Sequence, residues 1–151
     1  MPWPLIRGIH WNVLPLVAGL FVLVEALDRT GMLQLLASTL RELSAYAPGL
    51  AAWAAGGIVA AASNLINNLP AGLIAGQVVQ GAATSPVVTA AFLVGVDLGP
   101  NLSVTGSLAT LLWLVALRRG GLDVGAWTFL RLGALVMPPA LLLALAALQL
   151  G

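Results

Sequence analysis

The sequence has no cysteine and no lysine, one histidine and only five acidic residues among 151. Without cysteine, disulfides and thiolate metal ligands are excluded. With so few and such scattered acids, hydrolytic triads and zinc sites lack the side chains that they need. Only Arg118 and Arg119 are adjacent basic residues and the net charge is +1, whereas a nucleic-acid surface needs clustered cations. We therefore expect no enzyme, no cofactor, no metal site and no nucleic-acid partner.

Hydrophobic residues, in contrast, make up 60% of the chain and charged residues only 7%, with a mean hydropathy of +1.03. A water-soluble domain of this size does not sustain such a composition on its surface. The apolar residues come in long blocks, which indicates helices whose backbone groups bond internally within lipid. We expect one all-α integral membrane domain over residues 1–151, a multi-pass helical bundle with the lipid bilayer as its surroundings.

Three segments with simple patterns are predicted. Residues 11–27 form a first apolar span close to the minimum length that crosses a bilayer, with a secretory signal peptide as the alternative. Residues 31–46 carry leucines at helical spacing with polar residues largely off that line, which predicts an amphipathic helix in the membrane interface. Residues 127–150 form the last span.

Residues 43–96 carry no formal charge, yet Asn64, Asn67, Asn68 and Pro70 interrupt them. The apolar stretches on either side, residues 50–62 and 71–79, are each too short to cross a bilayer alone. We therefore expect a re-entrant hairpin over residues 50–80 with its asparagine-rich tip near the middle of the membrane. The alternative is one long helix kinked at Pro70.

A second interruption is expected within residues 86–117, which predict a discontinuous transmembrane helix. Gly99, Pro100 and Gly106 permit the chain to unwind there. An interrupted helix exposes N–H and C=O groups, which is costly in lipid unless a ligand or neighbouring protein bonds to them. The hydrogen-bonding side chains expected to bind a ligand at this break are Asn101, Ser103, Thr105 and Ser107.

Asp97 is the only acid well inside an apolar region of the sequence. A carboxylate within the membrane is a functional hypothesis by default, and here we assign it proton coupling. The alternative is a residue that is merely solvated at a wet helix break.

The arginines give an orientation. With three crossing segments and a re-entrant hairpin, Arg7, Arg118 and Arg119 share one side, and Arg29 and Arg41 share the other. Basic residues favour the cytoplasmic side. The first side is therefore predicted to be cytoplasmic.

Two strings carry a family resemblance: residues 62–71, ASNLINNLPA, and residues 97–114, DLGPNLSVTGSLATLLWL. They resemble the two signature regions of bacterial arsenite efflux permeases, the ArsB family of the ion transporter superfamily. The similarity continues through Arg118-Arg119-Gly120 and residues 129–133 into the Pro138-Pro139 helix and covers nearly the whole chain. By this resemblance the binding candidates are Asn67, Asn68, Asn101, Ser103, Thr105 and Ser107, and Asn64 joins them as the third asparagine of the tip.

The resemblance implies a multi-pass protein of the bacterial inner membrane that exports arsenite or antimonite, driven by the proton-motive force alone or by an associated ATPase subunit. The mechanism is alternating access, in which amides and hydroxyls hold the uncharged trihydroxide and a proton moves inward. Family members have two inverted halves, and this chain resembles the C-terminal one, so it corresponds to one half of an inverted-repeat transporter.

Three alternatives stay open on the sequence. The missing half lies on another polypeptide or is supplied by a second copy of this chain, or the chain is a truncated fragment or partner subunit that does not transport. A carboxylate or sodium/proton carrier of the same superfamily is a further alternative. A dicarboxylate site calls for an arginine near the middle of the membrane, and none of the six arginines lies there.

Overall fold

The computed structural model describes residues 13–150. Residues 1–12 and 151 lie outside it, and with them Arg7 and the first two positions of the span predicted at residues 11–27. Over the described part every regular element is a helix, so the prediction of an all-helical chain is confirmed there.

The described helices follow one another with short connections. Gly31, with φ of 80°, separates the first two helices, Pro48 opens the third, and Pro86 follows the capping residue Ser85. Proline suits a first helical turn because the missing N–H would have no partner there. The α-helices are α2 (Val13–Arg29), α3 (Met32–Tyr46), α4 (Pro48–Ile66), α5 (Asn68–Ala82), α6 (Pro86–Leu98), α7 (Leu108–Arg119) and α8 (Ala126–Leu148), with the 3-10 turns η1 (Gly99–Leu102) and η2 (Val104–Gly106) between α6 and α7.

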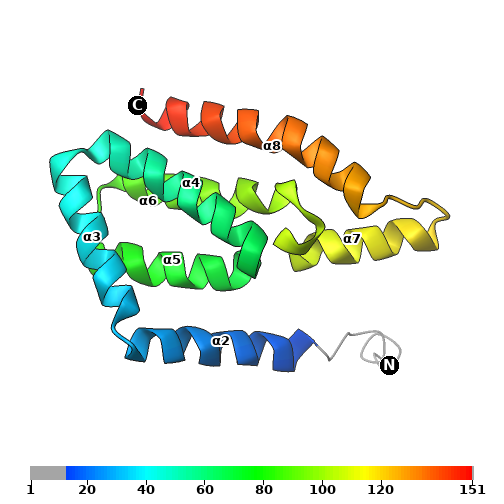
Figure 1. The fold of residues 1–151 in the computed structure, drawn as a ribbon, viewed down its shortest axis with the longest axis horizontal. Coiled ribbons are helices and arrows are strands. Elements are labelled where there is room, and N and C mark those ends of the chain that lie inside the picture. Colours follow the sequence, from blue (N-terminus) through cyan, green and yellow to red (C-terminus); the bar gives the residue numbers. More distant parts are fainter. Residues whose placement is uncertain (1–12, 151) are drawn as a thin grey trace, which may run out of the picture.

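Helices α4 and α5 form a hairpin: α5 runs back alongside α4 after the chain reverses at Asn67 (Figure 1). The chain is therefore not one long helix kinked at Pro70. Helix α3 crosses the end of the hairpin where α4 begins and α5 ends, and it buries Leu33, Ala37 and Leu40. Helix α2 lies along the outer side of the bundle next to α3 and α5.

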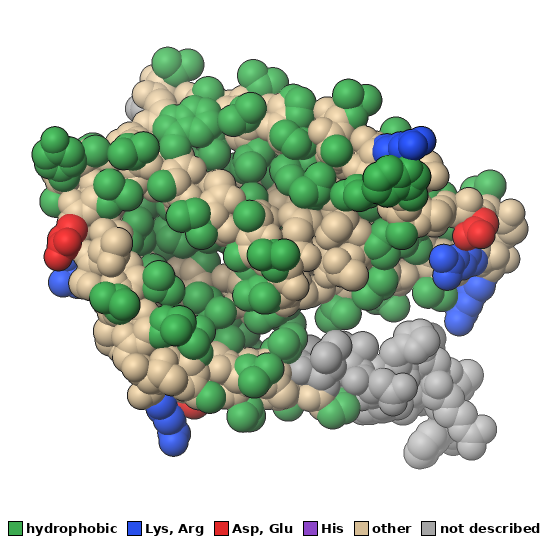
Figure 2. All heavy atoms as spheres, viewed as in Figure 1, with side chains coloured by type: hydrophobic (Ala, Val, Ile, Leu, Met, Phe, Trp, Pro, Cys, Tyr) green, Lys and Arg blue, Asp and Glu red, His purple; other side chains and the backbone are tan. Residues whose placement is uncertain are grey.

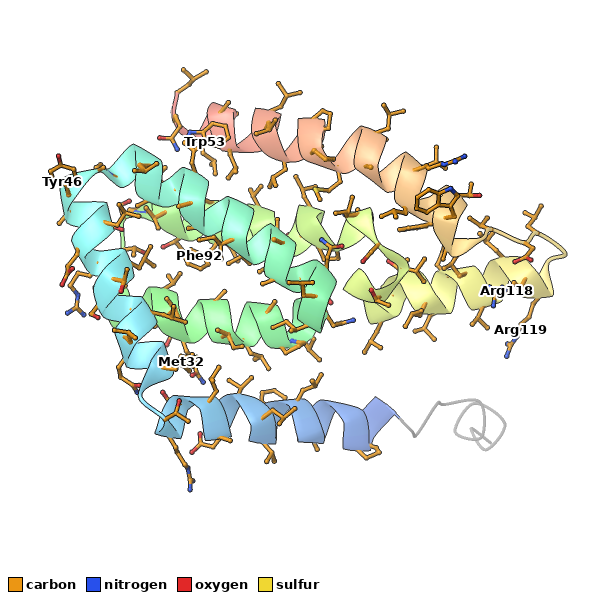
Figure 3. All side chains as sticks on the ribbon, in the orientation of Figure 1. Met32, Tyr46, Trp53, Phe92, Arg118 and Arg119 are labelled. Atoms are coloured by element: carbon orange, nitrogen blue, oxygen red, sulfur yellow. The ribbon has the colours of Figure 1, made fainter. Side chains whose placement is uncertain are left out.

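The closest packing in the bundle is between α4 and α6, and α8 covers α6 and η1. Small residues make this packing tight: Ala51, Ala52 and Ala91 are completely buried in the core. Phe92 projects from α6 into the same core (Figure 3). Helix α7 contacts mainly η2 and extends beyond the bundle in the direction in which α6 runs (Figure 1).

Two described helices, α4 and α8, are long and apolar enough to cross a membrane. Helix α4 has 19 residues and extends past the apolar stretch 50–62, so it is longer than the half-length arm that the sequence predicts. Helix α2 is described for 17 residues and is not among the described helices that are long enough to cross a membrane. Of the three crossing segments predicted from the sequence, only the last corresponds to a described helix of sufficient length, α8. The other such helix, α4, is an arm of the hairpin that the sequence predicts to be re-entrant.

The outer surface is apolar. Leu135 and Leu143 on α8 are each 72% exposed, and hydrophobic side chains are spread over the visible face, with charged side chains toward its edges (Figure 2). Tyr46 lies at one end of the molecule, while Arg118 and Arg119 extend from the end of α7 at the other (Figure 3). This distribution suits a protein surrounded by lipid along its middle and by water at its ends.

Candidate substrate site at the hairpin tip and the helix break

The tip of the hairpin is a single residue. Asn67 has φ of 76° and ψ of 151°, a positive-φ conformation outside the αL region that strains any residue with a Cβ. Its side-chain oxygen accepts a hydrogen bond from the backbone N–H of Leu69 at 3.3 Å. Asn67 therefore ends α4, reverses the chain and caps the first turn of α5.

The helix break is longer. After η1 the chain is extended at Ser103, turns again in η2 and is extended at Ser107, where φ is −147°. The hydroxyl oxygen of Ser107 accepts a bond from the N–H of Ala109 at 3.1 Å and so caps α7. Helices α6 and α7 thus run as two separate pieces joined by irregular backbone.

Asn64 joins the hairpin to the break. Its side-chain nitrogen donates to the carbonyl oxygen of Gly99 at 2.6 Å and to that of Ala60, one turn earlier in α4, at 2.9 Å. Its side-chain oxygen accepts a bond from the hydroxyl of Ser103 at 2.9 Å. A second link follows at the tip, where the side-chain nitrogen of Asn67 donates to the carbonyl of Thr105 at 3.1 Å. The two interruptions, nearly 40 residues apart in sequence, therefore form one polar junction.

Asn101 stabilises the break by hydrogen bonds to its own segment. Its side-chain nitrogen donates to the carbonyls of Asp97 and Leu98, each at 3.1 Å. These carbonyls belong to the last turn of α6, where a helix end leaves acceptors without their usual partners. The side chain of Asn101 thus replaces bonds that the helix would have made had it continued.

Glycines let the backbones meet around the junction. A Cβ on Gly99 would lie 2.5 Å from Ala60 Cα, and one on Gly95 would lie 2.5 Å from the carbonyl oxygen of Gly56. On the other side, a Cβ on Gly133 of α8 would lie 2.5 Å from the carbonyl oxygen of Asn101. Helices α4 and α8 therefore hold the start of the break from two sides by backbone contact.

The predicted site residues divide into three groups. Asn64, Asn67, Ser103 and Thr105 meet directly, and the hydroxyls of Ser103 and Thr105 lie 3.3 Å apart. Ser107 and Asn101 lie at the two ends of the break and bond to their own segments. Asn68 begins α5 beside the tip, half-buried, and Asp97 is exposed one turn before the break, with its backbone carbonyl in the junction.

Sequence reasoning missed three residues here. Gly95 packs α6 against α4 beside the junction, and Gly133 packs α8 against the break. A signal for the first was present, because Gly95 and Gly99 have the four-residue spacing that lets membrane helices approach closely. Ser63, which precedes Asn64, is completely buried, and its hydroxyl has no hydrogen-bond partner within the described part of the chain.

The junction is electrically neutral, because amides, hydroxyls and backbone groups make its hydrogen bonds. The N-terminal ends of α5 and α7 begin at Asn67 and Ser107, and helix N-termini carry partial positive charge. Among residues 13–150 no group of three histidine, cysteine or acidic side chains is placed to hold a metal ion. The junction thus offers amide, hydroxyl and backbone groups without a formal charge.

An all-helical chain with two helices fit to cross a bilayer and an apolar outer surface has the character of a membrane protein. The model of the ArsB family, described as arsenical pump membrane protein, matches residues 4–150, and the chain belongs to this family of membrane proteins.

The relatives that it resembles carry matching descriptions. It is 31% identical over 149 residues to the arsenical pump membrane proteins of Yersinia enterocolitica and Escherichia coli K12, covering 96% of this chain and 35% of each relative. It is 32% identical over 154 residues to an uncharacterized transporter of Mycobacterium tuberculosis, with the same coverage of 96% and 35%. The chain thus spans about a third of the length of these relatives. No solved structure matches the chain.

Proposed function

We propose that the chain is part of a secondary transporter of the bacterial inner membrane that exports arsenite or antimonite by alternating access, coupled to protons. The observation that carries this proposal is the junction, in which Asn64 and Asn67 of the hairpin bond across to Gly99 and Thr105 of a broken helix. Discontinuous helices that meet in this way are the usual binding sites of secondary transporters. Membership of the ArsB family, described as arsenical pump membrane protein, supports the choice of cargo.

The chemistry of the junction agrees with an uncharged trihydroxide. Such a guest offers hydroxyl groups that both donate and accept, and the hydroxyls of Ser103 and Thr105 do the same. Asn68 and the free side-chain oxygen of Asn101 lie at the edge of the same region. A dicarboxylate is a poorer guest, because no arginine within residues 13–150 donates a hydrogen bond to the junction.

The membrane arrangement belongs to the same proposal. The hairpin of α4 and α5 is re-entrant, with Asn67 near the middle of the bilayer, and α2, the broken helix α6–α7 and α8 cross it. Helix α3 lies in the interface, since it buries Leu33 and Leu40 while exposing Arg41 and Glu42. This is one half of an inverted-repeat transporter, and the topology of its arginines puts Arg118 and Arg119 in the cytoplasm.

Asp97 is the proposed proton carrier. It is exposed beside the break, and its backbone carbonyl accepts a bond from Asn101. A proton that arrives at this carboxylate neutralises the only acid near the junction. Because the carbonyl of the same residue belongs to the junction, a change at the carboxylate is placed to alter the site.

The rest of the transporter is a partner in this proposal. The chain spans 35% of the length of its relatives, so a second half, a second copy or an ATPase subunit completes the pathway. The alternative is a truncated fragment or partner subunit that does not transport by itself.

The test replaces the matching segment of the Escherichia coli relative with this chain, in cells that lack their own arsenite export. We expect growth on arsenite, and we expect Asn68→Ala or Asp97→Asn to reduce it. The variant Asp123→Asn, in the loop after α7, is the matched control for loss of one acid. Unchanged resistance in both site variants means that the site is assigned wrongly.

A second measurement concerns the chain alone. We expect everted vesicles that contain only this polypeptide to accumulate no arsenite when a proton gradient is applied. Robust uptake would show that copies of this chain complete the pathway without another protein.

A further inference from the structure

The backbone carbonyls at an unwound helix in a transporter are acceptors for a coupling cation such as sodium. In this structure several of these carbonyls are already occupied by side-chain amides. Asn101 bonds to those of Asp97 and Leu98, and Asn67 bonds to that of Thr105. The side-chain N–H groups of Asn67 and Asn101 thus bond to carbonyl oxygens that could otherwise coordinate a cation.

Asn64 is the central member of this set. An asparagine side chain has two N–H donors, and those of Asn64 are directed to Ala60 and Gly99 at 2.9 and 2.6 Å. Its side-chain oxygen already accepts a bond from Ser103. Little hydrogen-bonding capacity is left for a substrate, although the sequence predicts Asn64 as a ligand.

The backbone around Asn64 is fixed as well. The carbonyl to which it donates belongs to Gly99, whose Cα lies against Ala60 too closely for a side chain. The two carbonyl oxygens therefore stay next to each other whatever the guest. The Ala60 carbonyl already accepts the backbone N–H of Asn64 within α4. Its second lone pair and the Gly99 carbonyl both point to the Asn64 side-chain nitrogen, a position where a donor or a cation stabilises the pair.

We propose that Asn64 is a positioning residue whose side-chain amide permanently takes the place of a cation between the carbonyls of Ala60 and Gly99. The amide holds the hairpin against the break and orients the Ser103 hydroxyl, without sodium. The inference deepens the proposed function and rests on it only in treating the break as the transport site. Sodium then has no part in holding the junction together.

The substitution Asn64→Asp tests this idea because it keeps the shape of the side chain and removes the donors. A carboxylate would face two carbonyl oxygens, so three acceptors would meet without a hydrogen between them. A sodium ion, or a proton on the new acid, relieves the conflict. The variant should therefore acquire a sodium requirement that the natural protein lacks.

The measurement is the helix-unfolding midpoint of the full chain in detergent, in sodium chloride or in choline chloride at equal ionic strength. For the natural protein we expect no difference between the two salts. For Asn64→Asp in choline at neutral pH we expect a midpoint lower by on the order of 5 °C. Sodium should restore much of that loss, and so should acid, because the protonated side chain regains one donor.

Gln80→Glu is the matched control, since it makes the same amide-to-carboxylate change on the exposed side of α5. It should show no response that is specific to sodium. If Asn64→Asp does not accumulate, Asn67→Asp gives the same comparison at a more open position with one carbonyl, that of Thr105.

Two results overturn the inference. One is a sodium-specific rise in the midpoint of the natural protein, which would mean that a cation binds at the break. The other is an aspartate variant that is as stable as the natural protein and equally indifferent to sodium. Because no arsenite is present, a failure here is distinct from a failure of the proposed function, which is read from resistance.

Discussion

The hairpin tip and the helix break both interrupt a helix, yet they do so by different means. The tip needs one residue, Asn67, whose side chain caps the next helix while its backbone adopts a positive φ. The break takes residues 99–107, with two 3-10 turns and two extended serines. The tip reverses the direction of the chain, whereas after the break α7 continues in the direction in which α6 runs (Figure 1).

The difference lies in what holds each interruption in place. The tip is held by two side-chain bonds of Asn67, a local one from Leu69 N–H and one across to the carbonyl of Thr105. The start of the break is held by backbone contact with Ala60 on one side and Gly133 on the other. A tip of this kind tolerates repacking nearby, whereas the break depends on two other helices.

The largest effect should come from adding a methyl group at the break. In Gly99→Ala the new Cβ meets Ala60 Cα at 2.5 Å and the Ala60 oxygen at 2.6 Å, and backbone atoms cannot move aside. We expect a loss of about 3 kcal/mol in the free energy of unfolding, measured by denaturation in detergent.

The comparison for this substitution is Gly72→Ala in the hairpin. There the nearest atom is a side-chain methyl of Val96 at 3.3 Å, which can give way, so the loss should be much smaller. Equal losses at both glycines would show that the break is no more tightly packed than the hairpin.

The next effect concerns the backbone of the tip. In Asn67→Ala the cap is lost and a Cβ-bearing residue without a polar side chain must hold φ of 76°, for a total of about 2 kcal/mol. Asn67→Gly loses the same bonds without the strain, so it should cost about 1 kcal/mol. Unfolding measurements that rank alanine and glycine equally would rule out backbone strain as a determinant of the tip.

A smaller effect is expected at the far end of the break. Ser107→Ala removes the bond to Ala109 N–H at 3.1 Å and should cost about 1 kcal/mol, seen as faster hydrogen exchange in the first turn of α7. Ser85→Ala is the comparison, because its bond to Val88 is long at 3.5 Å. Greater exchange in the Ser85 variant would contradict the assignment of Ser107 as the stronger cap.

The smallest effect should lie outside both interruptions. Asp123→Asn removes an ion pair with Arg118 at 3.2 Å in which both side chains are largely exposed. Exposed pairs contribute less than about 0.5 kcal/mol, so unfolding should hardly change. The unfolding free energy of this variant is the reference for Gly99→Ala, Asn67→Ala and Ser107→Ala. A loss comparable to that of Ser107→Ala would show that the exposed ion pair contributes more than expected.

Much of the tip follows from the sequence. Three asparagines and a proline inside an uncharged run predict an interruption, and a single residue with positive φ, Asn67, turns the chain there. The same reasoning predicts a hairpin arm that ends at residue 62, before Asn64, whereas α4 continues to Ile66. It stays helical because its side chain bonds to Ala60 and to Gly99, and the second partner lies 35 residues away.

The break was predicted from glycine, proline and hydroxyl residues, but its partners were not. Gly133 belongs to a helix whose sequence gives no sign that it touches the carbonyl of Asn101. Contacts between backbones leave no side-chain pattern beyond the presence of glycine, and glycine also occurs in helices for other reasons.

The sequence by itself determined that this protein lies in lipid and where its helices are interrupted. Its apolar composition favours a bilayer, and backbone groups without hydrogen-bond partners are costly there. The tertiary structure decided which polar side chains bond to one another across the two interruptions. That choice depends on directed hydrogen bonds between segments nearly 40 residues apart, and bond direction is a property of packed helices rather than of residue order.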